Sequence, residues 1–374
     1  MKILYITDIS INGYSGKEKA TGEKIKSLRN VLNADFNYFS PKKNIKGVVL
    51  KFIYLIWFNF VLAFKILLFY RGFVIIERST FLVITNSLVR VFKFKVFSEI
   101  HADASEELKI SKKTKLEKII INLFWTIKLK MLCKNSGMIY NNPLLKTHFD
   151  KKIICPSISI YNGANTMLFK PQKNEKYRKL FNIDKNDIVF LFIGSGSIWH
   201  GLEYLIEIFN HPKMLEKKNI SLIIAGPNES VIHELTRSII NKNIFFTGTL
   251  NTTEAVEVIN TSNLCLLPVR SIRISPGSPL KLYDYAACGK AIITQENLPG
   301  YSDEVLNYNL GITVDFTKAD KAVKNLLDFI ESFDENSFLL NNSKIANKII
   351  NWDNRIESWV KFISSVLHEN QKKK

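Results

Sequence analysis

The stretch of the chain that is richest in candidate chemistry runs from Ser275 to Thr294 and reads SPGSPLKLYDYAACGKAIIT. It begins with small residues and continues as a short helical pattern, which Gly289 ends before the next apolar run. The start of a helix exposes unpaired backbone N–H groups and the positive end of the helix dipole, and both attract a diphosphate. The segment therefore predicts an anion site, formed by Gly277, Ser278, Pro279 and Leu280.

Two charged side chains follow this loop at helical spacing. Lys281 falls in the first turn, where its ammonium could add a charge-assisted contact to a phosphate. Asp284 comes one turn later, and its carboxylate could accept both hydroxyl groups of a ribose, as acidic residues do in dinucleotide-binding folds. Each residue also has an ordinary alternative, since Asp284 could be a solvated helix residue with Lys281 as its partner. Together with the loop they indicate a site for a nucleoside diphosphate.

Apolar runs of strand length alternate with helix-like stretches along the whole chain. In the first half the runs read KILYIT, FNYF, FVIIE, KVFSEI, GMIYN and ISIYN, and in the second half IVFLFIG, ISLIIAG, IFFTG, LCLLP and AIIT. Helical candidates such as Glu23–Leu32 and Lys115–Leu132 lie between them. This alternation predicts a parallel sheet covered by helices on both faces, and it occurs twice. We expect an α/β protein with two Rossmann-like domains that face each other across a cleft.

The boundary between the domains is expected where Pro171 and polar residues follow the last strand of the first half. This divides the chain into residues 1–168, residues 169–350 and a closing helical segment, 351–374. The length suffices for two separate cores. The four cysteines are scattered and form no C-x-x-C pair, which favours a reducing compartment. The first residues lack the long apolar region of a secretory signal, so we expect a cytoplasmic protein.

Basic charge and one long apolar segment both lie in the first half. Residues 1–170 hold 28 Lys and Arg against 11 Asp and Glu, whereas residues 171–374 hold 24 against 23. Such a basic surface attracts anionic lipid or nucleic acid, and a genomic bias toward lysine is the alternative. Val48–Tyr70 is almost wholly apolar, but Lys51 and Lys65 limit its uncharged stretch to 13 residues. A bilayer span needs about 20, so the segment suits either a helix in the membrane interface or a buried core helix.

The segment Ser275–Thr294 resembles the donor-binding segment of the retaining family-four glycosyltransferases of the GT-B fold, also called group 1 glycosyltransferases. Many of them carry the pattern S-P-x-K-L-x-E-Y-x-A-x-G-K-P-V-V. Further resemblances follow in the family's order. FLFIGSGSIWHGLEYLIEIF is similar to the opening of the donor domain, SISIYNGANTMLFKP to the end of the first domain, and NWDNRIESWVKFISSVL to the closing helices. The resemblance implies a GT-B fold and the transfer of a hexose from a UDP- or GDP-sugar, with retention of configuration.

The resemblance also implies roles for single residues. Asp284 matches the acid that binds the donor ribose, while Pro276 stands where many members have a second acid. His200 takes the place of a phosphate-binding lysine, and His101 that of the residue that reaches the transferred sugar. Both are therefore catalytic candidates, with a structural histidine or a plain loop residue as the alternative. The resemblance also points to Gly13, Gly16, Gly194 and Ser197 in the donor site. Arg270, which precedes the phosphate loop, could supply the missing charge there together with Lys281.

These observations predict an enzyme that needs neither a metal ion nor a cofactor. No D-x-D motif occurs in the chain, so helix N-termini and basic side chains would stabilise the departing diphosphate. The expected acceptor is a saccharide, carried on a polyprenyl diphosphate at the inner face of a bacterial membrane, in capsule or O-antigen assembly. The alternative is a catalytically silent GT-B scaffold that binds a glycan or a lipid. Nucleic acid is not an expected partner, because no recognised binding motif is present.

Overall fold

The computed structural model describes residues 1–11, 15–41, 48–111, 113–270 and 275–372. The chain forms two compact units and passes between them four times. Unit 1 holds Met1–Asn162, Arg273–Ser278 and Trp352–Lys374, and unit 2 holds Gly163–Ile272 and Pro279–Asn351. Each unit has its own sheet and its own core, so each is described separately.

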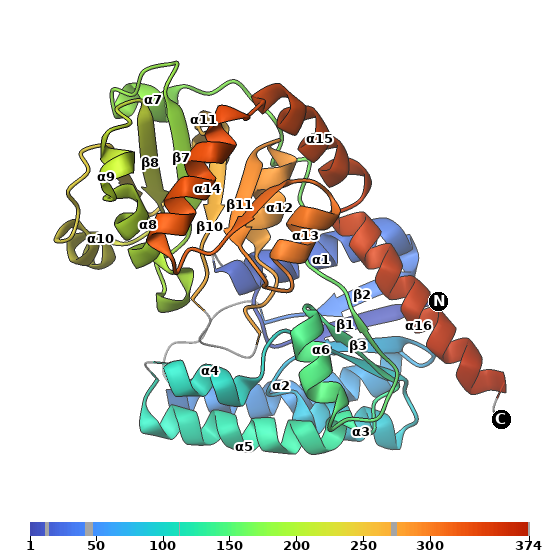
Figure 1. The fold of residues 1–374 in the computed structure, drawn as a ribbon. Coiled ribbons are helices and arrows are strands. Elements are labelled where there is room, and N and C mark those ends of the chain that lie inside the picture. The colour runs from blue at the N-terminus through green and yellow to red at the C-terminus, as the bar shows by residue number, and fades with distance from the viewer. Residues whose placement is uncertain (12–14, 42–47, 112, 271–274, 373–374) are drawn as a thin grey trace. The chain divides into compact units, whose positions relative to one another are not determined.

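Unit 1 is built on a parallel sheet of six strands in the order β2-β1-β3-β4-β5-β6 (Figure 1). The four central strands are buried on both faces, which is why they read as continuous apolar runs. The strands are β1 (Ile3–Thr7), β2 (Phe36–Phe39), β3 (Val74–Arg78), β4 (Val96–Ile100), β5 (Gly137–Tyr140) and β6 (Ser157–Ser159).

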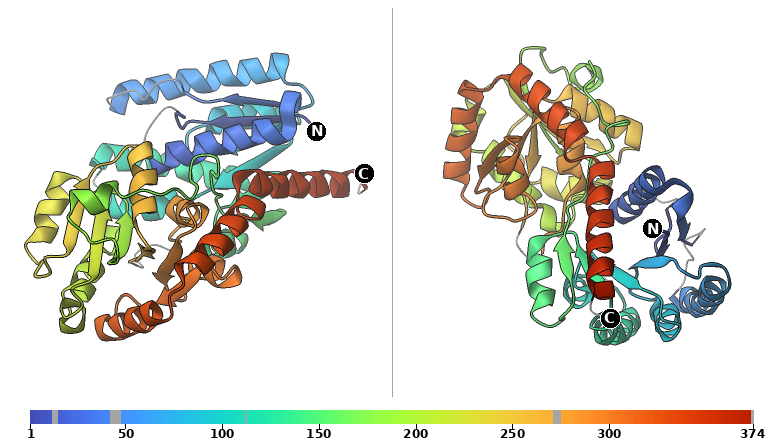
Figure 2. Two further views of the ribbon diagram at one scale, coloured as in Figure 1. Left: turned by 90° about the horizontal axis from the view of Figure 1, so that it is seen from above. Right: turned by 90° about the vertical axis from the view of Figure 1, so that its right-hand side faces the viewer.

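Two layers of helices cover this sheet. On one face, α1 (Gly16–Leu32) and α16 (Trp352–Lys372) pack on Ile3, Tyr5 and Ile76. On the other face, α2 (Val48–Phe69) and α3 (Val83–Val91) pack on Leu4, Ile6 and Ile75. The second layer continues with α5 (Lys115–Leu132) and α6 (Pro143–Asp150), which pack on β4 and β5, and the short helices are η1 (Asn33–Asp35) and α4 (Ala104–Ile110). Figure 2 shows α16, in red, lying along the unit-1 sheet.

Unit 2 repeats the architecture with the strand order β12-β11-β10-β7-β8-β9. Its strands are β7 (Ile188–Ile193), β8 (Ile220–Ala225), β9 (Ile244–Gly248), β10 (Leu264–Leu267), β11 (Ala291–Gln295) and β12 (Gly311–Val314). Phenylalanines of β7 pack against α8 (Leu202–Phe209) and α14 (Ala319–Glu331) in the main core. The other helices are α7 (Lys176–Leu180), η2 (Ile198–His200), α9 (Pro212–Leu215), α10 (Glu229–Thr236), α11 (Thr252–Thr261), α12 (Leu280–Ala287), α13 (Ser302–Asn307) and α15 (Glu335–Lys348).

The predicted fold class, two Rossmann-like domains with parallel sheets, is confirmed. The predicted helix Lys115–Leu132 has the bounds of α5, whereas α1 begins seven residues before the predicted Glu23. The reason is a capping box, in which Ser15 and Glu18 each accept a hydrogen bond from the other's backbone N–H. The sequence reading missed β12, a four-residue strand at the edge of the unit-2 sheet.

Helix α2 has features of both alternatives that the sequence left open for Val48–Tyr70, a helix in the membrane interface and a buried core helix. Leu55, Leu62 and Ile66 are buried in unit 1, while Trp57 and Phe64 are more than half exposed. By length and composition alone, Phe52–Phe69 would suffice to cross a membrane, and 28% of that stretch is buried. The helix therefore has one core face and one apolar outer face.

A buried tyrosine ties α12 to the end of β7. The backbone N–H of Ile193 donates to the hydroxyl of Tyr285 at 2.9 Å, and the tyrosine is fully buried. Tyr285→Phe leaves this N–H without its partner, so we expect the free energy of unfolding to fall by about 1–3 kcal/mol. Chemical denaturation measures it. The control is Tyr177→Phe, because the Tyr177 hydroxyl has no hydrogen-bond partner among the described residues; an equal loss in both variants would contradict the assignment.

Candidate functional site

The strand order of unit 2 identifies one crevice at the carboxyl edge of its sheet. From β7 the chain moves to β8 and β9 on one side and then returns to β10 on the other side of β7. In open parallel sheets, ligands bind at such a reversal, next to the carboxyl ends of the two diverging strands. The residues that follow these ends are Gly194 after β7 and Val269–Arg270 after β10.

Lys281, in the first turn of α12, extends over the end of β7. Its Nζ lies 4.3 Å from the centre of the Phe192 ring. A Cβ atom on Gly194 would come within 2.6 Å of this Nζ, so a larger residue at this position would displace the ammonium. Among the described residues, no carboxylate forms an ion pair with Lys281. Burial without a partner lowers the pKa of Lys281 to about 7.

The loop after β7 brings His200 to the same place. The His200 ring contacts the Phe192 ring edge-on, with 5.4 Å between centroids, and its Cε1 would lie 3.2 Å from a Cβ on Gly194. Ser197 precedes the η2 turn that holds His200, and its hydroxyl is 2.9 Å from that of Ser195. The structure thus gathers Gly194, His200 and Lys281 into one cationic corner.

Arg270 and Asp284, the other charged candidates of unit 2, have more specific surroundings. The Arg270 guanidinium forms an ion pair of 2.6 Å with Glu203 on α8, and its backbone N–H donates to the carbonyl of Trp199. Arg270 therefore lies beside the His200 loop, and Glu203 already balances its charge. Asp284 lies on α12, three residues after Lys281 and half-buried. Its position one turn from Lys281 suits the predicted ribose contact.

His101 follows β4 in unit 1 and lies among charged groups. Its Nε2 contacts Glu99 and is 2.9 Å from Nζ of Lys24, while Nδ1 is 3.0 Å from the amide of Asn141. Burial lowers the pKa of His101 to about 3, and the cations of Arg78 and Lys24 act in the same direction. The imidazole is therefore neutral across the physiological range, and both of its nitrogens face protein groups.

Of the remaining predicted residues, all but Pro279 and Leu280 belong to unit 1. Gly16 begins α1 and is exposed, and Gly13 lies outside the described residues. Gly277 accepts a hydrogen bond of 2.8 Å from the Asn142 side chain at its carbonyl. Ser278 accepts from the backbone and the side chain of Asn162, at 2.9 and 2.6 Å. Pro279 and Leu280 are the N-cap and the first residue of α12 in unit 2.

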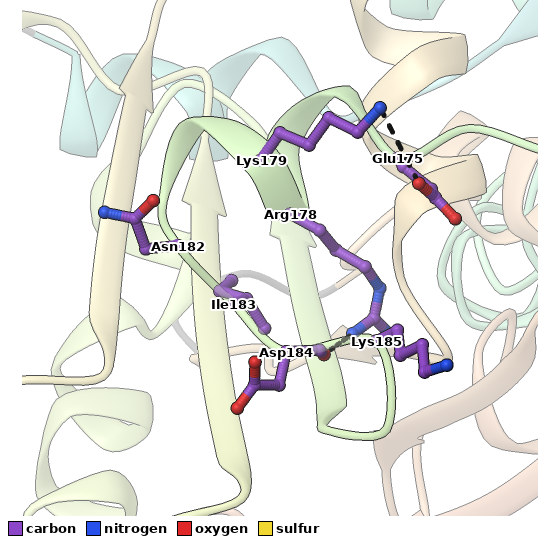
Figure 3. Close-up of a pocket in the computed structure, with 7 residues that line it drawn as sticks. All are labelled: Glu175, Arg178, Lys179, Asn182, Ile183, Asp184 and Lys185. Atoms are coloured by element: carbon purple, nitrogen blue, oxygen red, sulfur yellow. Dashed lines mark hydrogen bonds and ion pairs between the residues drawn. The ribbon is translucent and has the colours of Figure 1, made fainter.

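A surface pocket lies at the opposite edge of the unit-2 sheet. Figure 3 shows it between α7 and the start of β7, where Arg178 donates to the carbonyl of Asp184 at 2.7 Å. Its lining is Glu175, Arg178, Lys179, Asn182, Ile183, Asp184 and Lys185. It stands at the amino end of β7, away from the carboxyl edge where sites of α/β folds are built. We do not assign the candidate site to it.

The sequence reading missed the groups that surround His101. Lys24, Glu99 and Tyr5 are almost completely buried and connected by hydrogen bonds. One local signal was available, because Glu99 is two residues before His101 and side chains at that spacing point to the same face of a strand. Lys24 is 77 residues from His101 and gave no such signal.

Comparisons with known proteins relate the chain to glycosyltransferases. Residues 173–344 match the family model described as "Glycosyl transferases group 1". An uncharacterised glycosyltransferase of Methanocaldococcus jannaschii is 24% identical over 213 residues, which make up 56% of this chain. The match spans about half the length of that relative, 53%.

Two solved structures resemble the whole chain. Sucrose-phosphate synthase of Thermosynechococcus elongatus has a TM-score of 0.73 at 12% identity, and the match covers 99% of this chain and 100% of that one. HepE of Anabaena, solved with UDP and glucose, has a TM-score of 0.68 at 15% identity, with 98% and 100% covered. At these identities the likeness establishes the fold, which is the two-domain GT-B fold.

An ammonium held without a partner should lower stability, so its removal should raise stability. We expect Lys281→Met to increase the melting temperature at pH 6, where the lysine is charged in both the folded and the unfolded chain. Between pH 7 and about 10.4 the lysine is neutral in the folded chain and still charged in the unfolded chain, so the stability of the natural protein rises with pH. The increase in melting temperature caused by Lys281→Met therefore becomes smaller as the pH rises. Differential scanning calorimetry at pH 6 and pH 9.5 measures both effects.

The matched control is Lys290→Met. Lys290 is also buried in unit 2, but it lies 3.7 Å from Glu335 and contacts the carbonyl of Asn260. Its removal should lower the melting temperature, because a paired lysine is lost. A lower melting temperature for Lys281→Met at both pH values would show that Lys281 is a structural cation.

Proposed function

We propose, from the match of residues 173–344 to the model of group 1 glycosyltransferases, that the protein transfers a sugar from a nucleotide-diphosphate sugar to an acceptor. The observation that carries the proposal is the ammonium of Lys281, held beside Gly194 and His200 without a carboxylate partner. A diphosphate would supply the missing negative charge at the position where ligands of parallel sheets bind.

In this proposal different residues of unit 2 bind different parts of the donor. Lys281 and the start of α12 bind the diphosphate, and His200 donates a hydrogen bond to it. Asp284 accepts the ribose hydroxyls. As the bond to the sugar breaks, charge grows on the diphosphate, so these groups stabilise the transition state more than the ground state. The proposed donor is a UDP- or GDP-sugar carrying a hexose.

The proposed reaction proceeds without a metal ion and with retention of configuration. Within the described ranges, no three His, Cys, Asp or Glu side chains are grouped closely enough to hold a metal ion. The acceptor hydroxyl would attack from the face on which the diphosphate leaves. No covalent nucleophile is proposed. The alternative, a catalytically silent scaffold, would follow if the corner around Lys281 failed to bind any nucleotide.

We further propose a saccharide acceptor, carried on a polyprenyl diphosphate at the inner face of a bacterial membrane, in surface-polysaccharide assembly. The support is the outer surface of α2 and α5. On α2, Ile53, Trp57, Phe60, Phe64 and Leu68 are all more than half exposed and follow each other at spacings of three and four. On α5, Leu116, Ile119 and Leu123 repeat the pattern.

These two stripes lie on one side of unit 1. Both helices pack on the same face of the sheet, and the Phe52 and Phe124 rings meet with 5.5 Å between centroids. The side chain of Asn59 donates to the carbonyl of Phe81 and accepts from the backbone of Thr85. Because these bonds hold α2 against α3, we propose that α2 lies in the plane of the membrane interface.

The charge around the stripes fits an anionic bilayer. From Phe36 to Ile76 the chain has no Asp or Glu. On α5, Lys115 and Lys130 are exposed, and the one acid of that helix, Glu117, is bonded within its N-terminal capping box. Apolar side chains would enter the headgroup layer while lysines contact anionic lipids, and each lysine near the surface adds about 1 kcal/mol.

The donor proposal predicts metal-free binding of one nucleoside diphosphate. Calorimetry against UDP, GDP, ADP and CMP should give selective binding, weakened roughly ten- to a hundredfold by Asp284→Ala and by Lys281→Met, as for the loss of a charged hydrogen bond. Above pH 7.5 the affinity should fall by about tenfold per pH unit, because Lys281 must gain a proton to meet the diphosphate, and Lys281→Met should remove this slope.

The control variants are Lys324→Met and Asp328→Ala. Each of them removes a surface ion pair on α14, in which Nζ of Lys324 and the Asp328 carboxylate are 3.9 Å apart. Both variants should bind as the natural protein does. Absence of binding to every nucleotide at millimolar concentration, with folded protein, would contradict the donor site and favour the silent scaffold.

The membrane proposal predicts that the protein floats with vesicles that contain phosphatidylglycerol and stays behind with vesicles of phosphatidylcholine alone. The double variant Trp57→Glu, Phe64→Glu should lose flotation, since it places two charges in the apolar stripe. The control variant Ile240→Glu, Leu340→Glu changes two residues of unit 2 that are each 72% exposed. Flotation of the stripe variant at the level of the natural protein would overturn the assignment of α2.

A further inference from the structure

A buried lysine of α1, Lys24, joins four parts of unit 1. Its side chain is 2% exposed, and its ammonium donates to Oε1 of Glu99 on β4. Nε2 of His101, beyond the end of the same strand, lies 2.9 Å from Nζ. The rings of Trp352 and Trp359 on α16 have their centres 5.6 and 5.5 Å from Nζ. Neither the donor site nor the membrane surface proposed above uses this lysine.

The neighbours of Lys24 fix the charges in this cluster. The Tyr5 hydroxyl donates to Oε2 of Glu99 at 2.7 Å, so both carboxyl oxygens have donors. Burial alone would raise the pKa of Glu99, but the cations of Lys24 and Arg78 hold it well below its ordinary value. Glu99 is therefore a carboxylate, and the adjacent His101 is neutral and carries a single N–H.

The contacts of His101 decide which nitrogen bears that hydrogen. Burial lowers the pKa of Lys24 to about 7, so at pH 6 the side chain is an ammonium. An ammonium has donors only and therefore requires the lone pair of Nε2. Glu99 also contacts Nε2 and by itself would favour the opposite tautomer, with a hydrogen there. On the other side of the ring, Oδ1 of Asn141 is buried and has no hydrogen-bond partner within the described structure. A half-turn of this amide brings Oδ1 against an N–H on Nδ1, and the amide nitrogen then takes the buried position that Oδ1 leaves.

We propose that Lys24 is a positioning residue, which holds His101 in the Nδ1–H tautomer and in one ring orientation, with Trp352 and Trp359 as the walls of the ammonium site. The inference deepens the proposed function, since it rests on that function and on the place beside the transferred sugar that the family resemblance implies for His101. Both ring nitrogens are occupied by protein partners, so His101 accepts no proton from the acceptor. What it presents to the sugar is the edge of a fixed, neutral ring.

The two tryptophans make the C-terminal helix part of this support. A cation without water is stabilised by aromatic faces, and Lys24 has two of them in addition to its carboxylate. Trp352 is the first residue of unit 1 after the chain leaves unit 2. The orientation of His101 therefore depends on α16, although no residue of α16 contacts the imidazole in the described structure.

Long-range ¹H–¹⁵N spectra of histidine-labelled protein at pH 6 test the proposal, with the His101 signals assigned through His101→Gln. We expect the Nδ1–H form in the natural protein. In Lys24→Met the carboxylate of Glu99 takes over Nε2, so the ring should change to the Nε2–H form and the pKa of His101 should rise. With a donor that is turned over, kcat should fall at least tenfold while the donor KM stays unchanged.

The control is Lys128→Met. Lys128 is the other buried lysine of unit 1, paired with Glu77, and the pair contacts no histidine in the described structure. It should leave the His101 spectrum and kcat unchanged. An Nε2–H tautomer in the natural protein, or an unchanged tautomer in Lys24→Met, would overturn the proposal. The tautomer of the natural protein can be measured even if Lys24→Met does not fold, so the proposal can be contradicted in either case. The expected spectra without any turnover would support the positioning role and contradict the transferase function.

Discussion

The placement of buried positive charge is the constraint on which both units depend. Lys24, Lys128 and Lys290 are buried, and each lies within 4.0 Å of a glutamate. Such pairing is what makes a buried charge tolerable. Lys281 is the exception among the described lysines with a strongly lowered pKa, since burial acts on it without any opposing carboxylate. An uncompensated cation at the carboxyl edge of a parallel sheet indicates that the compensating charge comes from a ligand.

The two carboxyl edges are consequently built for different chemistry. In unit 1 the ammonium of Lys24 is paired with Glu99 and the imidazole of His101 is uncharged, with Arg78 as a further cation near them. In unit 2 Lys281, beside β7, has no carboxylate partner among the described residues. A paired lysine next to a neutral ring suits a saccharide, whose hydroxyl groups need oriented partners, and an unpaired lysine suits a diphosphate. This asymmetry follows from side chains alone, since the two sheets share the same architecture.

The sequence was informative where structure is local. Parallel strands buried on both faces are continuous apolar runs, so every predicted strand is present. Lys281 and Asp284 could be proposed as site residues because they follow a recognisable loop. The cluster around Lys24 could not be found in this way. Its members come from β1, α1, β4 and α16, and Lys24 and Glu99 are 75 residues apart. Such partners become visible only when the sheet order is known, because pairing of distant residues leaves no local pattern.

Helix α2 shows why the sequence of an apolar segment alone does not reveal which of its residues are buried and which are exposed. Its buried residues and its exposed residues are equally apolar, and the difference between Leu62 and Phe64 lies in what packs against them. The sheet of unit 1 separates the two functional surfaces proposed here, with α2 and α5 on one face and the Lys24 cluster with α16 on the other. A change in the apolar stripe therefore does not contact the His101 support. Because one sheet separates them, membrane binding and sugar positioning can be altered independently, and a variant that loses both has lost the fold of unit 1.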